Sequence, residues 1–365
     1  MSGRQCVTIQ TGRLPCAVAS DALVKAFPIG DFVAISPYLV DPRTSKKVNV
    51  GDGFILDSAL KLLGSRPARV ISSRLAISEE DLDAINSSRM LLVAGANTLK
   101  YDFQITPDFT PQLLDRIQVP VVLLGIGHYG TYAATAQPLL PAAEAVMREI
   151  LQRFPYVSVR CDASAGYLRS SIPDLAPQVL MTSCPVAYPV DKIFHGFERK
   201  TEYDQLVCTV TDRQALGAQL PLLNIAPQLF PSRRRILALH QDYENKGLWD
   251  LARSLGFEVF RGNTYESFLD LYRDTDIHIG NRLHAHLKCL SYGRRSFLTP
   301  FDLRQQFFAE SLDFPLIQRL PDLTLDSYDF ARYGARLGSA RTQMDIFLAA
   351  ARRLLGHPGV TMEVS

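Results

Sequence analysis

No stretch of the sequence approaches the roughly 18 uninterrupted apolar residues that suggest a membrane-spanning helix. The opening MSGRQCVTIQTGRLPC has no apolar run of signal-peptide length. Charge of one sign is not in excess either, because 39 basic residues face 37 acidic ones, a formal net charge of +2. Such a balance gives no general attraction for nucleic acid or an anionic membrane, so anion binding must be local. We expect a cytoplasmic protein with no nucleic-acid partner and no stable membrane insertion.

The six cysteines are scattered, and none pairs with another cysteine or a histidine at the spacing of a zinc site. They are Cys6, Cys16, Cys161, Cys184, Cys208 and Cys289. A disulfide framework is not indicated either, which agrees with reduced thiols in a cytosol. We expect no metal site.

Short β-branched runs alternate with helical patterns along the whole chain. Strands are predicted in the first half at residues 31–36, 68–72, 89–95, 119–125, 156–160 and 178–183. Helices are predicted between them at residues 53–63, from Ser78 onward, and at 110–117, 138–154 and 162–170. Near-continuously apolar strands that alternate with helices are typical of a doubly wound parallel sheet, which binds ligands beyond the carboxyl ends of its strands.

A second alternation of the same kind follows the irregular stretch 185–204. Its strands are predicted at residues 205–210, 234–240, 257–260, 276–280 and 295–299, and its helices near 247–255, 264–272, 282–292 and 303–311. Because 365 residues exceed the size at which one core usually divides, we predict two Rossmann-like α/β domains that face one cleft. They comprise residues 1–188 and 189–335, and residues 336–365 form a C-terminal helix that closes the second domain or crosses back onto the first.

The segment 279–293, IGNRLHAHLKCLSYG, combines an apolar stripe with cationic and titratable side chains. The preceding run ends a strand, so Asn281 is predicted to cap a helix that begins near Arg282. Leu283, Leu287 and Leu290 form the stripe that this helix buries.

Arg282 and His284 fall in the first turn of that helix, where unpaired backbone N–H groups and the helix dipole already favour an anion. A guanidinium binds a carboxylate or phosphate with two hydrogen bonds, and an imidazole titrates near neutral pH. His286 projects to the other side of the helix, so the two histidines do not chelate one metal. The pattern predicts an anion site capable of proton transfer. The alternative is that Arg282 and His284 only cap local carbonyls and pack.

The run Arg282-Leu283-His284-Ala285-His286, followed by LKCLSYGRRSFLTPFD, resembles the RLHA segment of the polysaccharide pyruvyltransferase family. Four other stretches resemble motifs of that family in the same order: NVGDGFILDSALKLL, LLVAGANTL, VVLLGIGHYG and VSVRCDASAGYLR. The resemblance spans residues 45 to 312. The family's usual glycine run is replaced here by Ala94-Gly95-Ala96-Asn97. Side chains therefore occupy a place where the family often has only backbone, so the acceptor is expected to differ from a typical polysaccharide.

The resemblance implies transfer of pyruvate from phosphoenolpyruvate onto two hydroxyls of a sugar, glycan or glycolipid, which forms a ketal and releases phosphate. It also implies a fold similar to the two-domain GT-B glycosyltransferases and a place in polysaccharide biosynthesis. In such a fold residues 1–188 are expected on the acceptor side and residues 189–335 on the phosphoenolpyruvate side. Phosphoenolpyruvate is then a co-substrate, and no further cofactor is expected. Homo-oligomerisation is left open.

Within this interpretation, Arg282, Leu283 and Arg160 are expected to bind phosphoenolpyruvate, whose carboxylate and phosphate need at least two cationic contacts. His284 is the candidate proton donor or phosphate contact, and Asp52, predicted to cap the helix from Gly53, is the candidate base for the acceptor hydroxyl. Two simpler interpretations stay open: a salt bridge of Arg160 to Asp162 or another surface acid, and helix capping alone for Asp52.

Three loop residues complete the predicted substrate-binding set. Asn97 ends a strand of the first half, Arg213 follows the first strand of the second half, and His128 lies in the loop after the fourth strand. The alternative for Asn97 and Arg213 is an ordinary turn residue, and for His128 a solvated side chain.

Residues 125–130 match G-x-G-x-x-G, the dinucleotide-binding fingerprint. That fingerprint needs a helix to open within the glycines, after the first strand of a sheet. Here the run follows the fourth strand, and the next helix is expected near Pro138, so nicotinamide binding is not expected.

Two other functions fit the same predicted fold. A GT-B-type glycosyltransferase that uses a nucleotide-sugar donor would release a nucleoside diphosphate instead of phosphate. A non-catalytic glycan-binding protein would keep its binding activity when Arg282 and His284 are replaced by alanine.

Overall fold

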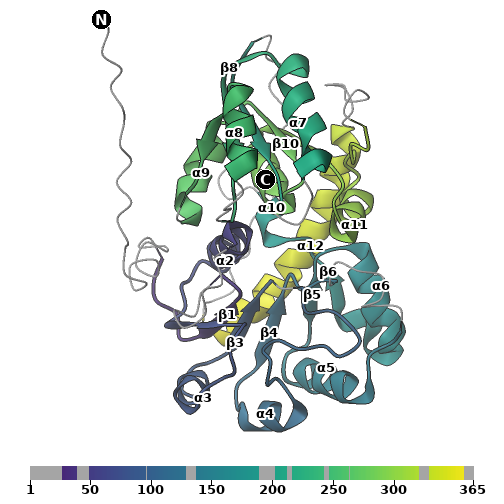
Figure 1. The fold of residues 1–365 in the computed structure, drawn as a ribbon. Helices are drawn as coiled ribbons and strands as arrows, with labels where there is room; N and C mark the ends of the chain where they lie inside the picture. Colours follow the sequence, from purple (N-terminus) through teal and green to yellow (C-terminus); the bar gives the residue numbers. More distant parts are fainter. Residues whose placement is uncertain are drawn as a thin grey trace, which may run out of the picture.

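The fold is described from a computed structural model, for residues 27–38, 49–95, 97–128, 137–188, 202–211, 216–241, 246–262, 264–319 and 329–356. Two α/β halves lie one above the other, with helices α2 and α12 between them (Figure 1). Each half is built on its own parallel sheet.

The first half contains a four-stranded parallel sheet in the order β2-β1-β3-β4. Its strands are β1 (Val33–Ser36), β2 (Arg69–Ser72), β3 (Leu91–Ala94) and β4 (Val121–Leu124). A second parallel pair, β5 (Val157–Val159) and β6 (Val179–Met181), continues from β4. The link is a parallel bridge in which Ile126 donates to the Ser158 carbonyl and accepts from Arg160 N, both at 3.0 Å. The winding direction reverses between β1 and β3.

Helices cover both faces of this sheet, because alternate residues of each strand point to opposite sides. Val33 and Ile35 belong to the core beneath α3, α4 and α5, whereas Phe32 and Ala34 belong to the core that includes α2 and α12. The first-half helices are α2 (Val50–Leu63), α3 (Glu79–Asn86), α4 (Pro111–Arg116), α5 (Pro141–Arg153) and α6 (Asp162–Ser171), with short 3-10 turns at Pro173–Gln178 and Pro185–Ala187.

The second half is a five-stranded parallel sheet in the order β11-β10-β7-β8-β9. Its strands are β7 (Tyr203–Thr209), β8 (Ser232–Ala238), β9 (Glu258–Phe260), β10 (Ile277–Gly280) and β11 (Arg295–Leu298). Its helices are α7 (Leu216–Leu229), α8 (Lys246–Ser254), α9 (Tyr265–Arg273), α10 (Leu283–Ser291) and α11 (Leu303–Leu312). The winding reverses between β7 and β10. The predicted pair of doubly wound parallel sheets is therefore confirmed.

Helix α12 (Phe330–Leu354) packs back onto the first half. Gln343 accepts a hydrogen bond from Met181 N at 2.8 Å, and the Phe347 ring meets Phe154 edge-on at 5.5 Å. The helix begins earlier than the predicted residue 336, because the Asp329 side chain caps it by accepting from Arg332 N at 3.0 Å. Of the two predicted positions for this helix, the structure has the one that crosses back.

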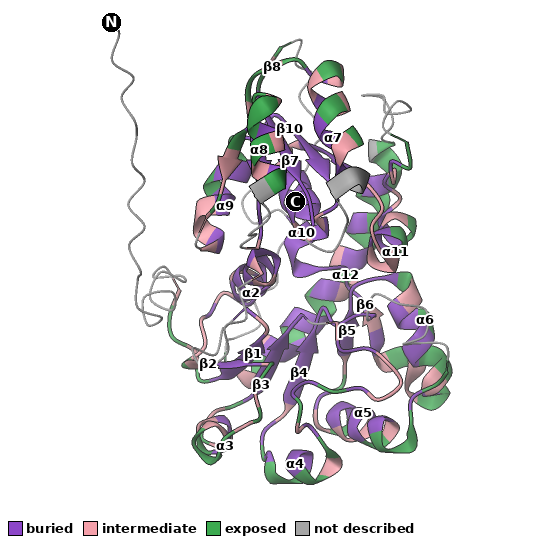
Figure 2. Ribbon diagram, viewed as in Figure 1, coloured by how far each residue is buried: buried purple, intermediate pink, exposed green. Residues whose placement is uncertain are grey.

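The two halves share one apolar core, which runs from the first sheet through α2 and α12 into the second half. Figure 2 shows buried residues on α2 and α10, where the halves meet. At the start of α2, Val50 N donates to the His240 carbonyl at 3.2 Å, and the Tyr38 ring meets Tyr265 edge-on at 5.4 Å. This shared core fixes the position of α2 against the second half.

Helix α7 was not predicted from the sequence. It contains Pro221 and Pro227, which lack the N–H that a helix interior needs and normally end a helical pattern. Helix α5 begins at Pro141 and not near Pro138. No helix in the described ranges has the length and apolar character needed to cross a bilayer.

Candidate functional site

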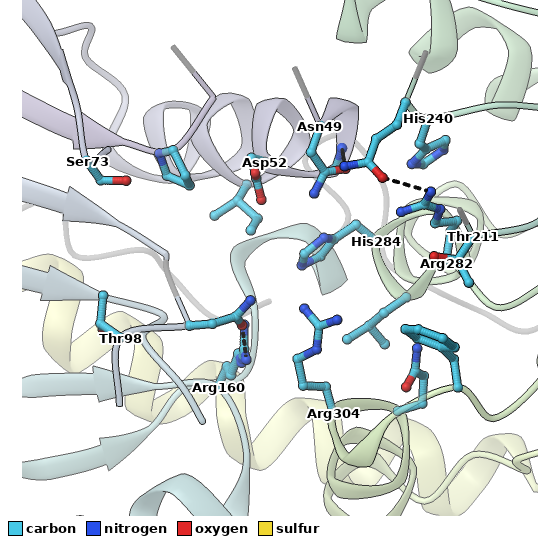
Figure 3. A pocket seen from close by; sticks show the side chains of 18 of the residues that line it. Asn49, Asp52, Ser73, Thr98, Arg160, Thr211, His240, Arg282, His284 and Arg304 are labelled. Carbon is cyan, nitrogen blue, oxygen red and sulfur yellow. Dashed lines mark hydrogen bonds between the residues drawn. The ribbon is translucent and has the colours of Figure 1, made fainter. Parts of the chain in front are cut away.

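A pocket of about 400 Å³ opens between the halves, at the carboxyl ends of both sheets (Figure 3). The residues that line it are Pro37, Asn49, Gly51, Asp52, Ile55, Ser73, Arg74, Asn97, Thr98, Gln104, Ile105, Arg160, Thr211, His240, Gln241, Asn281, Arg282, Leu283, His284, Phe301, Arg304 and Gln305. Pro37 and Asn97 follow β1 and β3, and Thr211 and Arg282 follow β7 and β10. Each pair flanks the point where its sheet reverses winding, the usual ligand position in such folds.

Four arginines and a single carboxylate line this pocket. Arg74 follows β2, Arg160 follows β5, Arg282 follows β10, and Arg304 lies in the first turn of α11. The carboxylate is that of Asp52, in the first turn of α2. This excess of positive charge suits a small ligand that has more than one negative charge.

Arg160 is a buried cation held by uncharged acceptors. Its side chain donates to the His128 carbonyl at 2.8 Å and to the Asn97 side-chain oxygen. Its guanidinium lies 5.8 Å from the centre of the Phe308 ring, and burial lowers its pKa. A salt bridge to Asp162 is not formed; Asp162 is exposed, and its backbone N donates to Ser311. Arginine stays charged even so, which leaves the charge of Arg160 available to a ligand.

Arg282 is fixed at the end of β10, directly before α10. Its Nε donates to the Val210 carbonyl at 2.8 Å, and its Nη2 donates to Gln241 at 3.2 Å. Arg282, and not Asn281, is the N-cap residue, so the predicted cap was one residue too early. Leu283 is then the first residue of the helix and packs as a buried wall of the pocket.

His284 projects from α10 into the centre of the pocket, between Arg282, Arg304 and Arg160 (Figure 3). Its Nε2 is buried and has no hydrogen-bond partner among the described residues. Burial, and then the charges of these three arginines, lower the pKa of His284 to about 3. In the free protein the imidazole is therefore neutral at physiological pH, and it does not titrate near neutrality as its residue type suggests.

Asp52 is not the cap of its helix. Helix α2 begins at Val50 and is capped by Asn49, whose side-chain oxygen accepts from Gly51 N at 3.2 Å. Asp52 is thereby free to face the pocket, where its carboxylate lies 3.6 Å from Nη2 of Arg74. Burial raises the pKa of Asp52 to about 6, although Arg74, Arg304, Asn49 and Arg160 act in the opposite direction. A carboxyl group with this pKa can exchange a proton near neutral pH.

The three predicted loop residues differ in their relation to the pocket. Asn97 lines the pocket and binds Arg160, as its position after β3 suggested. His128 is not a solvated loop residue: it is 5% exposed, its Nδ1 lies 3.0 Å from the Ser164 hydroxyl, and it is not among the lining residues. Its carbonyl oxygen, which holds Arg160, is its link to the site. Arg213 lies outside the described residues.

Sequence reasoning did not identify Arg304, Arg74, Asn49 or Thr98 as pocket residues. Arg304 had a detectable signal, because Asp302 and Gln305 form a capping box that starts α11 soon after β11. The Arg304 Nε lies 2.9 Å from the Asp302 carboxylate, which holds the guanidinium at the pocket. Arg74 follows β2 as Arg160 follows β5, so a search for cations just after strands, which selected Arg160, would also have found Arg74.

The described part of the chain has no group of three His, Cys, Asp or Glu side chains that could hold a metal ion. Among the described residues, the first helix after the glycines at 125–130 begins at Pro141, which does not match the dinucleotide fingerprint.

A sequence model of the polysaccharide pyruvyl transferase family matches residues 49–299. The chain belongs to the polysaccharide pyruvyl transferase family. The match contains Asp52, Arg160, Arg282 and His284 and ends before Arg304. Comparison with curated protein sequences gives no significant match.

Solved structures with similar folds include the following three. The S. aureus MnaA–UDP complex is 11% identical with a TM-score of 0.43, over 87% of this chain and 91% of that one. The wall teichoic acid polymerase TagF is 11% identical with a TM-score of 0.42, over 90% and 84%. UDP-GlcNAc 2-epimerase from Neisseria meningitidis, bound to UDP-GlcNAc, is 14% identical with a TM-score of 0.44, over 83% and 89%. These likenesses concern the fold and not the chemistry.

Proposed function

We propose that the protein transfers pyruvate from phosphoenolpyruvate onto two hydroxyls of a sugar, glycan or glycolipid, forming a ketal and releasing phosphate. The observation that supports this most is the convergence of Arg160, Arg282 and Arg304 around His284. At neutral pH a phosphate monoester has about 1.5 to 2 negative charges, and the carboxylate adds one. The donor thus has close to three negative charges for these guanidiniums to contact, and Arg304 shares its charge with Asp302.

In the proposed reaction C3 of phosphoenolpyruvate gains a proton and becomes the methyl group. C2 forms bonds to two acceptor oxygens, and its bond to the phosphate oxygen breaks. Of the two protons that the hydroxyls lose, one balances the proton gained by C3 and the other leaves with phosphate. The protein must therefore supply one proton to carbon and remove protons from the acceptor.

His284 is the proposed proton donor to C3. It is neutral in the free protein because burial and three arginine charges lower its pKa to about 3. A bound donor offsets those arginine charges and places negative charge beside the imidazole, so its pKa rises on binding. Donor binding therefore favours protonation of the histidine, which couples proton transfer to the occupied site.

Asp52 is the proposed base for an acceptor hydroxyl. Its carboxylate faces the same pocket from α2, and with a pKa of about 6 it is mostly ionised at pH 7. The cytoplasm, where phosphoenolpyruvate is available, is the proposed location.

The test is to incubate the purified protein with phosphoenolpyruvate and a panel of sugars and glycans. We expect phosphate release and an acceptor mass gain equal to pyruvate minus water, both lost in Arg282→Ala and His284→Ala variants that remain folded. Release of a nucleoside diphosphate from nucleotide sugars, without consumption of phosphoenolpyruvate, would instead identify a glycosyltransferase. Glycan binding without turnover, unchanged in both variants, would identify a non-catalytic protein.

A further inference from the structure

One wall of the pocket belongs to the first half and lies opposite Arg282 and Thr211. It comes from the loops after β2 and β3 and the segment that follows, and it consists of Ser73, Arg74, Thr98 and Gln104. In Figure 3, Ser73 and Thr98 lie on one side of the pocket, and Thr211 and Arg282 lie on the other. This wall offers hydroxyl and amide groups, which are the usual partners of sugar hydroxyls.

Thr98 has a hydrogen-bonding group that the protein itself does not use. The residue is 7% exposed, and its Oγ1 is buried without a hydrogen-bond partner among the described residues. A buried hydroxyl left unpaired destabilises a protein, whereas valine would fill the same space without that cost. A polar ligand group that enters the pocket would supply the missing partner.

The charge of this wall is already offset. Arg74 lies 3.6 Å from the Asp52 carboxylate, so the pair leaves little net charge beside Thr98. Arg304 is likewise paired, since its Nε lies 2.9 Å from the Asp302 carboxylate, so the described cations of the pocket do not exceed the roughly three negative charges of the donor. A second anion in the pocket would therefore be repelled by the donor, with no surplus cation among the described residues to offset it.

From these observations we propose that Ser73, Arg74, Thr98 and Gln104 form the acceptor subsite, and that this subsite takes an uncharged sugar. The two reacting hydroxyls then lie between this wall and the donor, with Asp52 beside them. This assignment rests on the proposed pyruvyl transfer, because the donor's charge is part of the argument.

The test compares binding of neutral methyl hexosides with binding of the same hexosides carrying a sulfate ester, measured by ligand-observed NMR. Thr98→Val removes the hydroxyl at nearly constant volume, and Thr98→Ser is the matched control that keeps it. We expect wild type to bind at least one neutral hexoside and to bind it more tightly than its sulfate. We expect Thr98→Val to weaken that binding roughly three- to tenfold and Thr98→Ser to retain it.

The affinity of each variant for phosphoenolpyruvate is measured in the same preparations and is expected to match wild type. It also serves as the control for folding. The subsite proposal is overturned if no neutral hexoside binds, if the sulfated sugars bind more tightly, or if Thr98→Val binds like wild type. Hexoside binding that depends on Thr98, in a protein that does not bind phosphoenolpyruvate, would refute the proposed donor and leave this subsite standing.

Discussion

At the scale of single residues, Arg160 reaches the pocket past a position with no side chain. A Cβ atom placed on Gly127 would lie 2.7 Å from Cγ and Cδ of Arg160. We expect Gly127→Ala to displace the guanidinium and lower kcat/KM with phosphoenolpyruvate by about 100-fold, since a 1 Å misplacement is enough for such a loss. Steady-state phosphate release measures it.

Gly166 provides the matched control. It lies in α6, and an added Cβ would meet nothing within 4 Å. Gly166→Ala should stabilise the protein by about 0.5–1 kcal/mol, because alanine loses less backbone entropy in a helix, and should leave kcat/KM unchanged. Equal activity in the two variants would contradict the proposed role of Arg160.

Asp52 is expected to make the protein more active and less stable. Its pKa is raised to about 6 in the folded state, so its ionisation is disfavoured there. The stabilisation that protonated Asp52 contributes below pH 4 is lost as the pH rises through 6, because the unfolded chain releases this proton more readily. We expect Asp52→Asn to raise the free energy of unfolding at pH 7 by about 1–3 kcal/mol and to lower kcat by about 100- to 10,000-fold.

Urea denaturation and phosphate release measure the two effects of Asp52→Asn. A variant that is less stable than wild type yet equally active would show that Asp52 serves the fold and not the reaction.

At the scale of elements, α12 holds the two halves together through a few buried side chains. Phe347 has no exposed surface and packs edge-on against Phe154 of the first half, whereas the neighbouring Ile346 is 45% exposed. We expect Phe347→Ala to lower the free energy of unfolding by about 3–4 kcal/mol, through lost burial and the cavity that remains. Ile346→Ala, on the solvent side, should cost less than about 0.5 kcal/mol. Chemical denaturation monitored by circular dichroism tests both, and similar losses would refute this docking of α12.

The first turns of two helices supply much of the reactive geometry. Helix α2 presents Asn49 and Asp52, and α10 presents His284, with so little space between them that a Cβ on Gly51 would lie 2.8 Å from Nδ1 of His284. The sequence predicted both helices, but the predicted first residue of each helix was wrong. Asn and Asp both cap helices well, so the pattern at Asn49 and Asp52 allowed either start.

At the scale of the whole molecule, every described histidine has a lowered pKa. The value is about 4 for His128 and about 3 for His278 and His284, and those of His240 and His286 lie well below the usual 6.5. Burial is the largest cause in each case. Because the unfolded chain takes up protons below pH 6.5 that the folded protein does not, stability falls as the pH falls from 6.5 toward 4.

Each such histidine contributes up to about 1.4 kcal/mol per pH unit in this window. Asp52 has the opposite effect on stability between pH 6 and 3.8. It takes up only one proton, whereas the five described histidines together can take up five on unfolding. We therefore expect the melting temperature to fall steadily from pH 7 to pH 5, as measured by differential scanning calorimetry. A constant melting temperature over this range would contradict burial of these histidines.

Much of this molecule follows from its pattern of apolar runs. The alternation of strands and helices predicted both parallel sheets, and the positions of Arg160, Asn97 and Arg282 after strands predicted that they would meet. The sequence could not predict that His284 is neutral, since that depends on burial and on arginines from three separate segments. Thr98 gave no signal either, because its unpaired hydroxyl exists only in the folded pocket.

The central claim is that the pocket between the halves holds phosphoenolpyruvate against Arg160, Arg282, Arg304 and His284. A crystal structure of the protein soaked with phosphoenolpyruvate tests it most directly. We expect the phosphate and carboxylate within hydrogen-bonding distance of these guanidiniums, with the imidazole of His284 close to C3. Phosphoenolpyruvate bound elsewhere, or an empty pocket at saturating ligand, would contradict the account.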